Sequence, residues 1–296
     1  MSFLPLALSD EFFLRLPYRV RKALGEGLVV RHKVGSSTIL VPTARDLKRW
    51  KSNWMSDVLT RVCPHFPGAF LDVGVNRLQT YFALRAVDAE RVYYGFEPNP
   101  ACSTYAWQTF RLNPSSPSFI LSCALSDSSG VLDLWVTRGS EYDSCATTVR
   151  DLRPGRDLVR LAAPAATADE MFSGLGILQI GLLKIDVEGG ELAVLRGGSN
   201  TLGSMRPLVL CEVLHRDNKA SAESHRRHLL AIRELLHETR YDIYQLAKSG
   251  DTAMVQSIRR IIDFENLVWT KQNSDDCDYF FCPTEKVELL DGLFRT

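Results

Sequence analysis

Short runs of β-favouring residues alternate with helical stretches through most of this chain of 296 residues. The runs are bounded by Gly, Pro, Asn, Asp or Ser, and helix-compatible segments lie between them. The runs cover Ala69–Gly74, Arg91–Glu97, Ser118–Leu125, Gly181–Val187, Pro207–Val213, Tyr241–Leu246 and Asp278–Pro283. Alternation of this kind predicts an α/β fold with a mostly parallel sheet covered by helices on both faces. A ligand of such a sheet binds beyond the carboxyl ends of its strands.

Two of the intervening segments show the helical pattern most clearly. In Ser224–Thr239, apolar residues such as Leu229 and Ile232 recur at helical spacing, with charged residues between them. Glu191–Gly198 is a shorter candidate, because Glu191 suits the positive end of a helix dipole and a glycine supplies the left-handed stop. We expect both helices to pack on the sheet.

The start of the chain and one internal segment depart from the alternation. Residues 1–65 show none, and we expect a helical N-terminal extension there, followed by the main domain over 66–296. Inside that domain, Val131–Thr137 reads as an extra strand, and a Gly-, Pro- and Arg-rich insertion follows at about 138–166. We expect a long loop or hairpin near the site, where such segments often form lids or substrate-binding elements; disorder is the alternative.

The balance of charge excludes some partners. Lys plus Arg and Asp plus Glu each number 35, so the formal charge is zero. Because no basic surplus exists to neutralise a phosphate backbone, we expect no nucleic-acid partner.

No apolar run approaches the ~20 residues that cross a bilayer, and no signal peptide is evident, so we expect a cytoplasmic protein without a transmembrane segment. The aromatic and basic segment 10–33 fits a helix packed on the domain better than a membrane-surface helix.

The seven cysteines are scattered and odd in number. Several lie in apolar strand-like runs, where a free thiol behaves as a small hydrophobic group, so we expect reduced thiols. Only Cys277 and Cys282 are closely spaced, and no second pair lies near them. The sequence therefore predicts no metal site.

A turn follows the first predicted strand, in the stretch FLDVGVNRLQT (Phe70–Thr80). Asp72 and Gly74 close the strand and Asn76 follows, so backbone N–H groups at a helix start can face an anionic or carboxylate-bearing ligand. Glu97 ends the second strand, 25 residues after Asp72, close to the spacing of the acidic residue that binds ribose hydroxyls in dinucleotide-binding folds. Together these residues predict half of a nucleoside site. The alternative for Glu97 is a surface residue at a strand end.

Polar residues also follow the third and fifth strands. Asp127, in ALSDSSG, is either an acceptor for an exocyclic amine or a simple turn former. Glu212 lies near the end of the fifth strand and His215 just after it. Either side chain can act as a general base toward a substrate hydroxyl, although a solvated loop histidine is the alternative for His215.

The stretch LLKIDVEGGE places three charged residues, Lys184, Asp186 and Glu188, on one side of a strand. A central parallel strand should be apolar on both faces, so this strand either lies at an edge or opens into a functional cleft. Buried charges are tolerated only when they are paired or used, which favours the cleft. Lys184 can simply neutralise a neighbouring carboxylate. A divalent metal held by Asp186, Glu188 and Glu191 is conceivable, but ligand types alone do not establish it.

From Phe70 to Pro283 the sequence resembles the FkbM family of S-adenosylmethionine-dependent methyltransferases. The resemblance is carried, in order, by FLDVGVN, YYGFEPNP, ALSDSSG, TADEMF, LLKIDVEGGELAVLRGG, RPLVLCEV and DYFFCP. KIDVEGGE and GFEPNP are its most specific parts. It implies a class I methyltransferase (Rossmann-like) fold over 66–296, with seven strands of which the last is antiparallel.

The resemblance also implies a reaction and roles for residues. S-adenosylmethionine is the implied cofactor, and the methyl group passes to a hydroxyl of a carbohydrate or small-molecule acceptor. The implied cofactor-binding residues are Asp72, Gly74 and Asn76 at the methionine part, Glu97 at the ribose, Asp127 at the adenine and Asp186 beside the reacting centre. Pro98, Asn99 and Ser126, which neighbour Glu97 and Asp127 in the sequence, are implied to bind the cofactor as well. The candidates for the general base are Glu188, Glu212 and His215, in that order.

One position departs from the family's pattern. Glycine is expected two residues after Asn76, where Leu78 stands. A positive φ there would strain the leucine, whereas a helical residue would pack inward at little cost. The alternative function is therefore a non-catalytic donor-binding or scaffold protein with a degenerate glycine loop. A nicotinamide-dependent oxidoreductase is weaker, because Gly-x-Gly-x-x-Gly is missing after the first strand; hydrolase and phosphotransferase motifs are absent as well.

Overall fold

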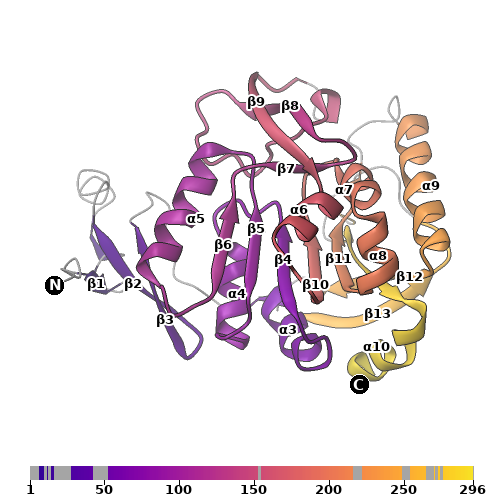
Figure 1. The fold of residues 1–296 in the computed structure, drawn as a ribbon, viewed down its shortest axis with the longest axis horizontal. Coiled ribbons are helices and arrows are strands. Elements are labelled where there is room, and N and C mark those ends of the chain that lie inside the picture. Colours follow the sequence, from indigo (N-terminus) through magenta and orange to yellow (C-terminus); the bar gives the residue numbers. More distant parts are fainter. Residues whose placement is uncertain are drawn as a thin grey trace.

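An eight-stranded sheet forms the centre of the molecule (Figure 1). The computed structural model describes residues 7–9, 12, 15–16, 28–42, 53–152, 155–215, 222–248, 254–264, 270, 273 and 276–295. In spatial order the strands are β13 (Val255–Ile261), β12 (Tyr241–Lys248), β14 (Asp278–Pro283), β11 (Leu208–Glu212), β10 (Ile180–Ile185), β4 (Ala69–Val73), β5 (Tyr93–Phe96) and β6 (Ser118–Leu121). Strands β11, β10, β4, β5 and β6 pair in parallel, whereas β14 and β13 run antiparallel to their neighbours. The predicted mostly parallel α/β sheet is confirmed.

The expected number of seven strands is wrong by one. All seven predicted runs contribute to the sheet, and the eighth strand is β13, at its edge. Its sequence, VQSIRRI, pairs only with β12 and is largely solvent-exposed, so it lacks the apolar alternation that marks a buried strand. The predicted run Ser118–Leu125 also divides, because its second half leaves the main sheet as β7 (Ala124–Ser126).

Helices cover both faces of the sheet, as the sequence predicts. Strand residues alternate between the faces: Phe70 and Leu182 belong to one apolar core, Leu71 and Leu183 to the other. The first core is covered by α3 (Trp54–Val62), α4 (Gln79–Val87), α5 (Pro100–Leu112) and α10 (Val287–Phe294). The second is covered by α6 (Ala168–Gly174), α7 (Glu191–Gly197), α8 (Ser199–Met205) and α9 (Ala222–Glu238). Short 3₁₀ turns occur at Cys63–His65, Arg150–Leu152 and Thr284–Lys286.

The N-terminal part is mostly strand in its described residues, so the predicted helical extension is wrong there. β1 (Ala7–Ser9), β2 (Val29–Val34) and β3 (Ser37–Pro42) form a separate three-stranded sheet. Alternate residues of β2 are buried, and Gly35, with a φ of +59°, begins the turn into β3. A two-residue Gly-Ser turn between β-rich runs is a hairpin signal that the prediction missed. Most of the predicted helix over 10–33 lies outside the described residues.

The insertion after the third strand is a hairpin, one of its two predicted forms. β8 (Gly130–Thr137) and β9 (Leu158–Thr167) pair antiparallel, and β7 joins them in a three-stranded sheet. The connection between β8 and β9 is anchored where Thr147 bridges to Trp135. Figure 1 shows this small sheet above one end of the main sheet.

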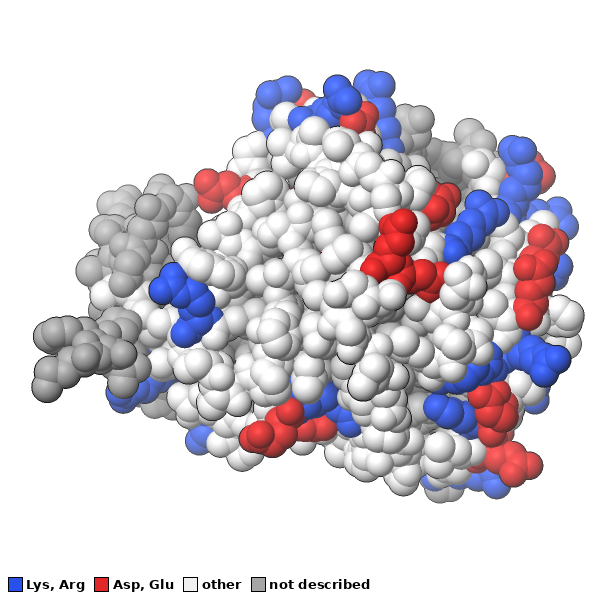
Figure 2. All heavy atoms as spheres, viewed as in Figure 1, with Lys and Arg blue, Asp and Glu red and all other residues white. Residues whose placement is uncertain are grey.

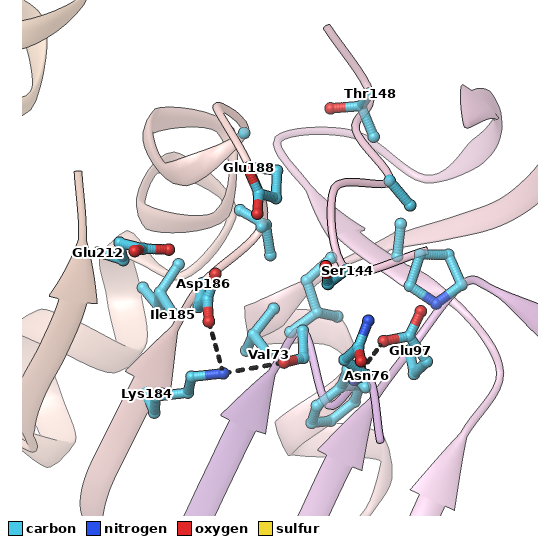
Figure 3. A pocket seen from close by; sticks show the side chains of 18 of the residues that line it. Val73, Asn76, Glu97, Ser144, Thr148, Lys184, Ile185, Asp186, Glu188 and Glu212 are labelled. Carbon is cyan, nitrogen blue, oxygen red and sulfur yellow. Dashed lines mark hydrogen bonds and ion pairs between the residues drawn. The ribbon is translucent and has the colours of Figure 1, made fainter. Parts of the chain in front are cut away.

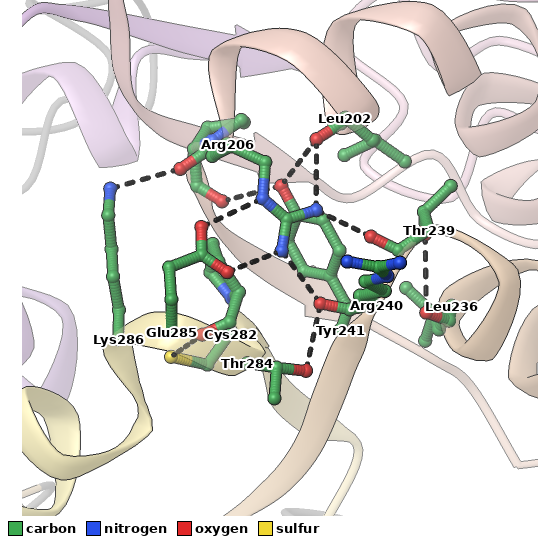
Figure 4. Close-up of polar contacts among 12 residues, drawn as sticks. Leu202, Arg206, Leu236, Thr239, Arg240, Tyr241, Cys282, Thr284, Glu285 and Lys286 are labelled. Atoms are coloured by element: carbon green, nitrogen blue, oxygen red, sulfur yellow. Dashed lines mark hydrogen bonds and ion pairs between the residues drawn. The ribbon is translucent and has the colours of Figure 1, made fainter.

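Arg206 ties together the connections at the opposite end of the sheet (Figure 4). Its guanidinium donates two hydrogen bonds to Glu285, at 2.9 and 2.7 Å, and further ones to the backbone carbonyls of Thr239 and Arg240. The same group lies 4.7 Å from the ring centroid of Tyr241. The planar fork of arginine makes this arrangement possible. It links the ends of α8 and α9 to the segment before α10.

The surface in Figure 2 carries charges of both signs, and they lie mainly around the rim of that face. Lys and Arg do not merge there into one continuous basic area. Among the described helices, none is long and apolar enough to cross a membrane.

Candidate functional site

A cavity of about 670 Å³ lies at the carboxyl ends of the central strands. Its walls come from the ends of β4, β5, β10 and β11, from β8, from the loop after β8 and from the start of α3. The predicted site residues that line it are Gly74, Asn76, Glu97, Pro98, Ser126, Asp186, Glu188 and Glu212. Figure 3 shows Asn76 and Glu97 at one side and the carboxylates Asp186, Glu188 and Glu212 at the other. The volume suits a small-molecule ligand.

Gly74 makes the first turn possible. Its φ is +90°, and a Cβ at this position would lie 1.8 Å from the carbonyl oxygen of Asp186. The strand ends meet here because the amide of Asp186 donates to the carbonyl of Val73 at 2.9 Å. Only glycine fits such a close approach of two backbones. The turn therefore carries Asn76 to the cavity wall.

Lys184 forms the floor between the two sides. Its ammonium lies 2.9 Å from the carbonyl oxygen of Gly74, 3.1 Å from Asp72 and 3.3 Å from Asp186. Burial alone would lower the pKa of Lys184, but the Asp186 and Asp72 carboxylates raise it above its ordinary value. Because β10 is central in the sheet, the charges of LLKIDVEGGE face a cleft and not an open edge. Lys184 has the neutralising role that the sequence allowed.

Asp72 lies beneath the cavity and not in its wall. It is fully buried, accepts a 2.6 Å hydrogen bond from the hydroxyl of Tyr93 and pairs with Lys184. Burial raises the pKa of Asp72, and the nearby Lys184 opposes that shift. Asp72 therefore does not touch a ligand in the cavity directly. It can affect such a ligand only by positioning Lys184, which in turn holds the turn at Gly74.

Glu97 is held by backbone amides at the other side of the cavity. One carboxylate oxygen accepts from the amide of Asn76 at 2.7 Å, and the other from the amide of Asn99 at 2.8 Å. The residue is only 6% exposed, so it is not the surface residue of the alternative interpretation. Burial raises the pKa of Glu97 to about 6, against the opposing effect of those amides. The carboxylate is thus fixed in direction while it lines the cavity.

The remaining residues predicted around the donor divide into two groups. Pro98 and Ser126 line the cavity. Asn99 caps α5, accepting from the amide of Ala101 at 3.0 Å, and its side-chain amide donates to the carbonyl of Glu141 at 3.0 Å. Asp127 is exposed and does not line the cavity. Asn99 therefore holds the loop after β8, and Asp127 has the surroundings of a turn residue.

Three carboxylates meet at the second side of the cavity. Asp186, Glu188 and Glu212 each have an oxygen within 4.8 Å of the others. Burial raises the pKa of Glu212 to about 10, and Asp186 adds to that shift. Glu188 lies in the turn between β10 and α7 with a φ of +55°. Grouped carboxyl groups of this kind can supply both a proton acceptor, when one is ionised, and a proton donor, when its neighbour is protonated.

His215 and Glu191 are not part of this group. His215 follows β11 but does not line the cavity. Glu191 begins α7, where its carboxylate accepts from the amide of Gly189 at 2.7 Å and lies 3.7 Å from the imidazole of His228. The structure therefore brings Glu212, and not Glu191, to Asp186 and Glu188.

The sequence interpretation expected the insertion after Thr137 near the site, but it named none of the cavity residues that come from that insertion or from other distant segments. The loop after β8 contributes Asp143, Ser144, Cys145, Ala146 and Thr148, the start of α3 contributes Asn53, Trp54 and Met55, and β14 contributes Asp278. The loop is held in place because Asn76 donates to the carbonyl of Asp143 at 3.2 Å and Thr147 donates to that of Glu188 at 2.5 Å. Asn53 is a helix cap before an apolar run, a local signal that marks a helix but not its position over a cavity.

Comparison with known proteins gives a family. The model of the methyltransferase FkbM domain matches residues 72–243. Comparison with curated proteins gave no match.

The solved structures similar to the chain include three methyltransferases. A methyltransferase FkbM from Methylobacillus flagellatus is 14% identical, with a TM-score of 0.42; the match covers 72% of this chain and 43% of that one. The chain thus spans less than half of that protein's length. A precorrin-6y C5,15-methyltransferase from Geobacter metallireducens is 9% identical, with 77% and 83% covered and a TM-score of 0.36. An SAM-dependent methyltransferase from Agrobacterium tumefaciens is 7% identical, with 91% and 80% covered and a TM-score of 0.36.

Proposed function

The chain belongs to the FkbM methyltransferase family, and from this premise we propose that it transfers the methyl group of S-adenosylmethionine to a hydroxyl of a sugar or small metabolite. The observation that carries the proposal is a single cavity with an amide-held carboxylate, Glu97, at one side and a carboxylate cluster at the other. The first side suits a nucleoside and the second a hydroxyl that loses its proton.

The residues at the Glu97 side fit the donor by their chemistry. Each carboxylate oxygen of Glu97 accepts one amide hydrogen bond and keeps a further lone pair for a ribose hydroxyl. The turn with Gly74 and Asn76 would hold the methionine part, and Pro98 and Ser126 would lie against the nucleoside. In this proposal Asp72 acts through Lys184, Asn99 holds the loop over the site, and Asp127 makes no contact with the donor.

The carboxylate side supports the transfer itself. When bound, S-adenosylmethionine supplies a methyl group on a positively charged sulfur. The cavity residues must align the acceptor oxygen with that methyl group, and such positioning can lower a barrier by roughly 7–11 kcal/mol. Glu188 would take the proton of the acceptor hydroxyl while the methyl group that the donor supplies exchanges its bond to sulfur for a bond to the acceptor oxygen. In this proposal Asp186, which pairs with Lys184, would lie beside the reacting centre.

The non-catalytic alternative depended on damage to the glycine loop at Leu78. Leu78 has a φ of +67°, and its side chain is fully buried in the core under α4. It does not line the cavity. The leucine therefore puts strain on the backbone, but its side chain does not occupy the space where a donor would bind.

Calorimetry with S-adenosylmethionine and S-adenosylhomocysteine tests donor binding. Glu97→Gln should weaken binding by about 1.5–3 kcal/mol, because a charged acceptor is lost from a buried site. Asp127→Asn is the matched control, since it removes an exposed carboxylate outside the cavity and should leave binding unchanged. Absence of binding at millimolar donor would reject the proposal. A screen of hydroxylated acceptors, read by S-adenosylhomocysteine production, then tests the transfer.

A further inference from the structure

Glu212 has acidic neighbours on two elements. Asp186 and Glu188 approach it from the end of β10 and the following turn, and Cys277 and Asp278 approach it from the start of β14. The thiol of Cys277 donates to one carboxylate oxygen of Glu212 at 3.3 Å. Carboxylates within 4.8 Å of one another repel each other when both are charged, and this repulsion favours a state in which one of them holds a proton.

The positions of the lysines indicate which carboxyl group holds the proton. Lys184 lies 3.3 Å from Asp186 and also pairs with Asp72. Lys248, on β12, pairs with Asp278 and lies 4.2 Å from the ring centroid of Trp54. Within the described part of the chain, no Lys, Arg or His forms an ion pair with Glu212. Asp186 and Asp278 thus each pair with a lysine, whereas Glu212 has no such ion pair among the described residues.

We propose that Glu212 keeps its proton during the reaction and positions Asp186 by donating a hydrogen bond to it, while Glu188 takes the acceptor proton. The inference rests on the proposed methyl transfer and assigns the part that Glu212 has in it. Glu212 is then a positioning residue and not the general base. Because its proton is already in place, it cannot accept the proton of an acceptor hydroxyl.

The surroundings of Glu212 agree with this assignment. Burial raises its pKa to about 10, and Asp186, Asp278 and Glu188 all add to the shift. Near pH 7 the side chain is therefore a neutral donor in the cavity wall. A donor at this place lets Asp186 stay ionised beside Glu212 and fixes the direction of the Asp186 carboxylate.

Carbon-13 NMR of protein labelled at the glutamate carboxyl carbons tests the protonation state without any acceptor. We expect one resonance that is missing in Glu212→Gln, keeps the position of a protonated carboxyl through neutral pH, and moves only near pH 10. Movement of that resonance near the ordinary glutamate value, about pH 4.3, would overturn the proposal. Should Glu212→Gln fail to fold, Cys277→Ser identifies the same resonance by its shift, because the thiol contacts this carboxyl group.

Variants test the positioning role once an acceptor is found. Glu212→Gln keeps a neutral hydrogen-bond donor of the same shape, so kcat should stay within about twofold of wild type, whereas Glu212→Ala should lose roughly tenfold or more. Glu188→Gln should lower kcat by roughly 10²-fold or more, because it removes the general base. Equal loss in Glu212→Gln and Glu188→Gln would contradict the proposal.

The outcomes separate this inference from the proposed function. Donor binding by the wild-type protein tests the function, and it does not depend on the proton of Glu212. If the donor binds and the Glu212 resonance moves near the ordinary value, the function stands and the inference fails. If no donor binds and the resonance stays protonated, the carboxyl arrangement is correct but its assigned part in methyl transfer fails.

Discussion

The ammonium of Lys184 lies 3.1 Å from a carboxylate oxygen of Asp72, and this pair joins β10 to β4 directly beneath the cavity. Both side chains are nearly removed from solvent, with exposed fractions of 7% and 0%. The same ammonium bonds to the carbonyl of Gly74, so one cation holds the first turn and the carboxylate that supports it. The floor of the site is therefore a buried ionic network.

Removing the cation from this network should be costly. Lys184→Met leaves the Asp72 carboxyl group buried without its ion-pair partner, so we expect a loss of about 3–5 kcal/mol in the free energy of unfolding. Lys184→Met combined with Asp72→Asn should recover part of the loss, because the unpaired carboxyl group is gone. Urea unfolding of the wild type, both single variants and the double variant measures this. A purely additive double variant would show that the pair is not coupled.

Leu78→Gly should change stability and not donor affinity. Removing a fully buried leucine costs about 2.7–5 kcal/mol, and relief of the left-handed backbone returns about 1–2 kcal/mol. The expected net loss is about 1–4 kcal/mol by urea unfolding, with unchanged calorimetric binding of S-adenosylhomocysteine. Leu84→Gly is the control, because Leu84 is equally buried but has helical backbone, and it should lose more. Tenfold tighter donor binding in Leu78→Gly would show that the leucine impairs the site.

Donor affinity should rise with pH through the titration of Glu97. The pKa of Glu97 in the folded empty protein is raised from 4.5 to about 6, so its stability contribution is complete below about pH 4.5 and is lost as pH rises through about 6. Ribose hydroxyls donate to the ionised form, so binding of S-adenosylhomocysteine should strengthen about tenfold from pH 5 to pH 7. Calorimetry over this range measures the effect. Glu97→Gln should bind weakly with a much flatter pH profile, and an unchanged slope in this variant would assign the effect to another group.

Arg206→Lys should destabilise the fold although it keeps the charge. A lysine cannot donate at once to Glu285 and to the backbone carbonyls of Thr239 and Arg240, so we expect a loss of about 1–3 kcal/mol in the free energy of unfolding. Arg138→Lys is the matched control, because the Arg138–Asp157 pair is 65% and 69% exposed. That change should stay within about 0.5 kcal/mol. Equal effects of the two substitutions would show that the geometry around Arg206 does not matter.

The elements that could be predicted are those with a local periodic signal. Buried strands such as β4 and β10 and the amphipathic helix α9 follow from spacing alone. Strand β13 and the β2–β3 hairpin were not predicted, because β13 is mostly exposed at an edge and the hairpin depends on a two-residue turn. Local pattern does not report how a segment with mixed polarity will pair.

The residues of the candidate site likewise include some that could be predicted from the sequence and some that could not. Gly74, Glu97 and Asp186 could be placed together, because the ends of parallel strands meet at one edge of a sheet. Glu212, at the end of the next strand, could be assigned to the same site, but its place within 4.8 Å of Asp186 and Glu188 could not be predicted. The insertion could be expected near the site, but not which of its residues, such as Ser144 and Thr148, line the cavity. Those contacts join residues far apart in the chain, and no spacing in the sequence encodes them.

Leu78 shows most clearly where prediction from the sequence ends. From the sequence its backbone was either left-handed and strained or helical and packed, and the structure combines the strain with the packing.

The sequence by itself determined the family, the order of strands and helices and the residues at the strand ends, because these depend on local pattern and motif. Only the tertiary structure decided which carboxylates lie together, which of them stay beneath the cavity and where Leu78 points, because burial and charge pairing arise when distant segments pack together.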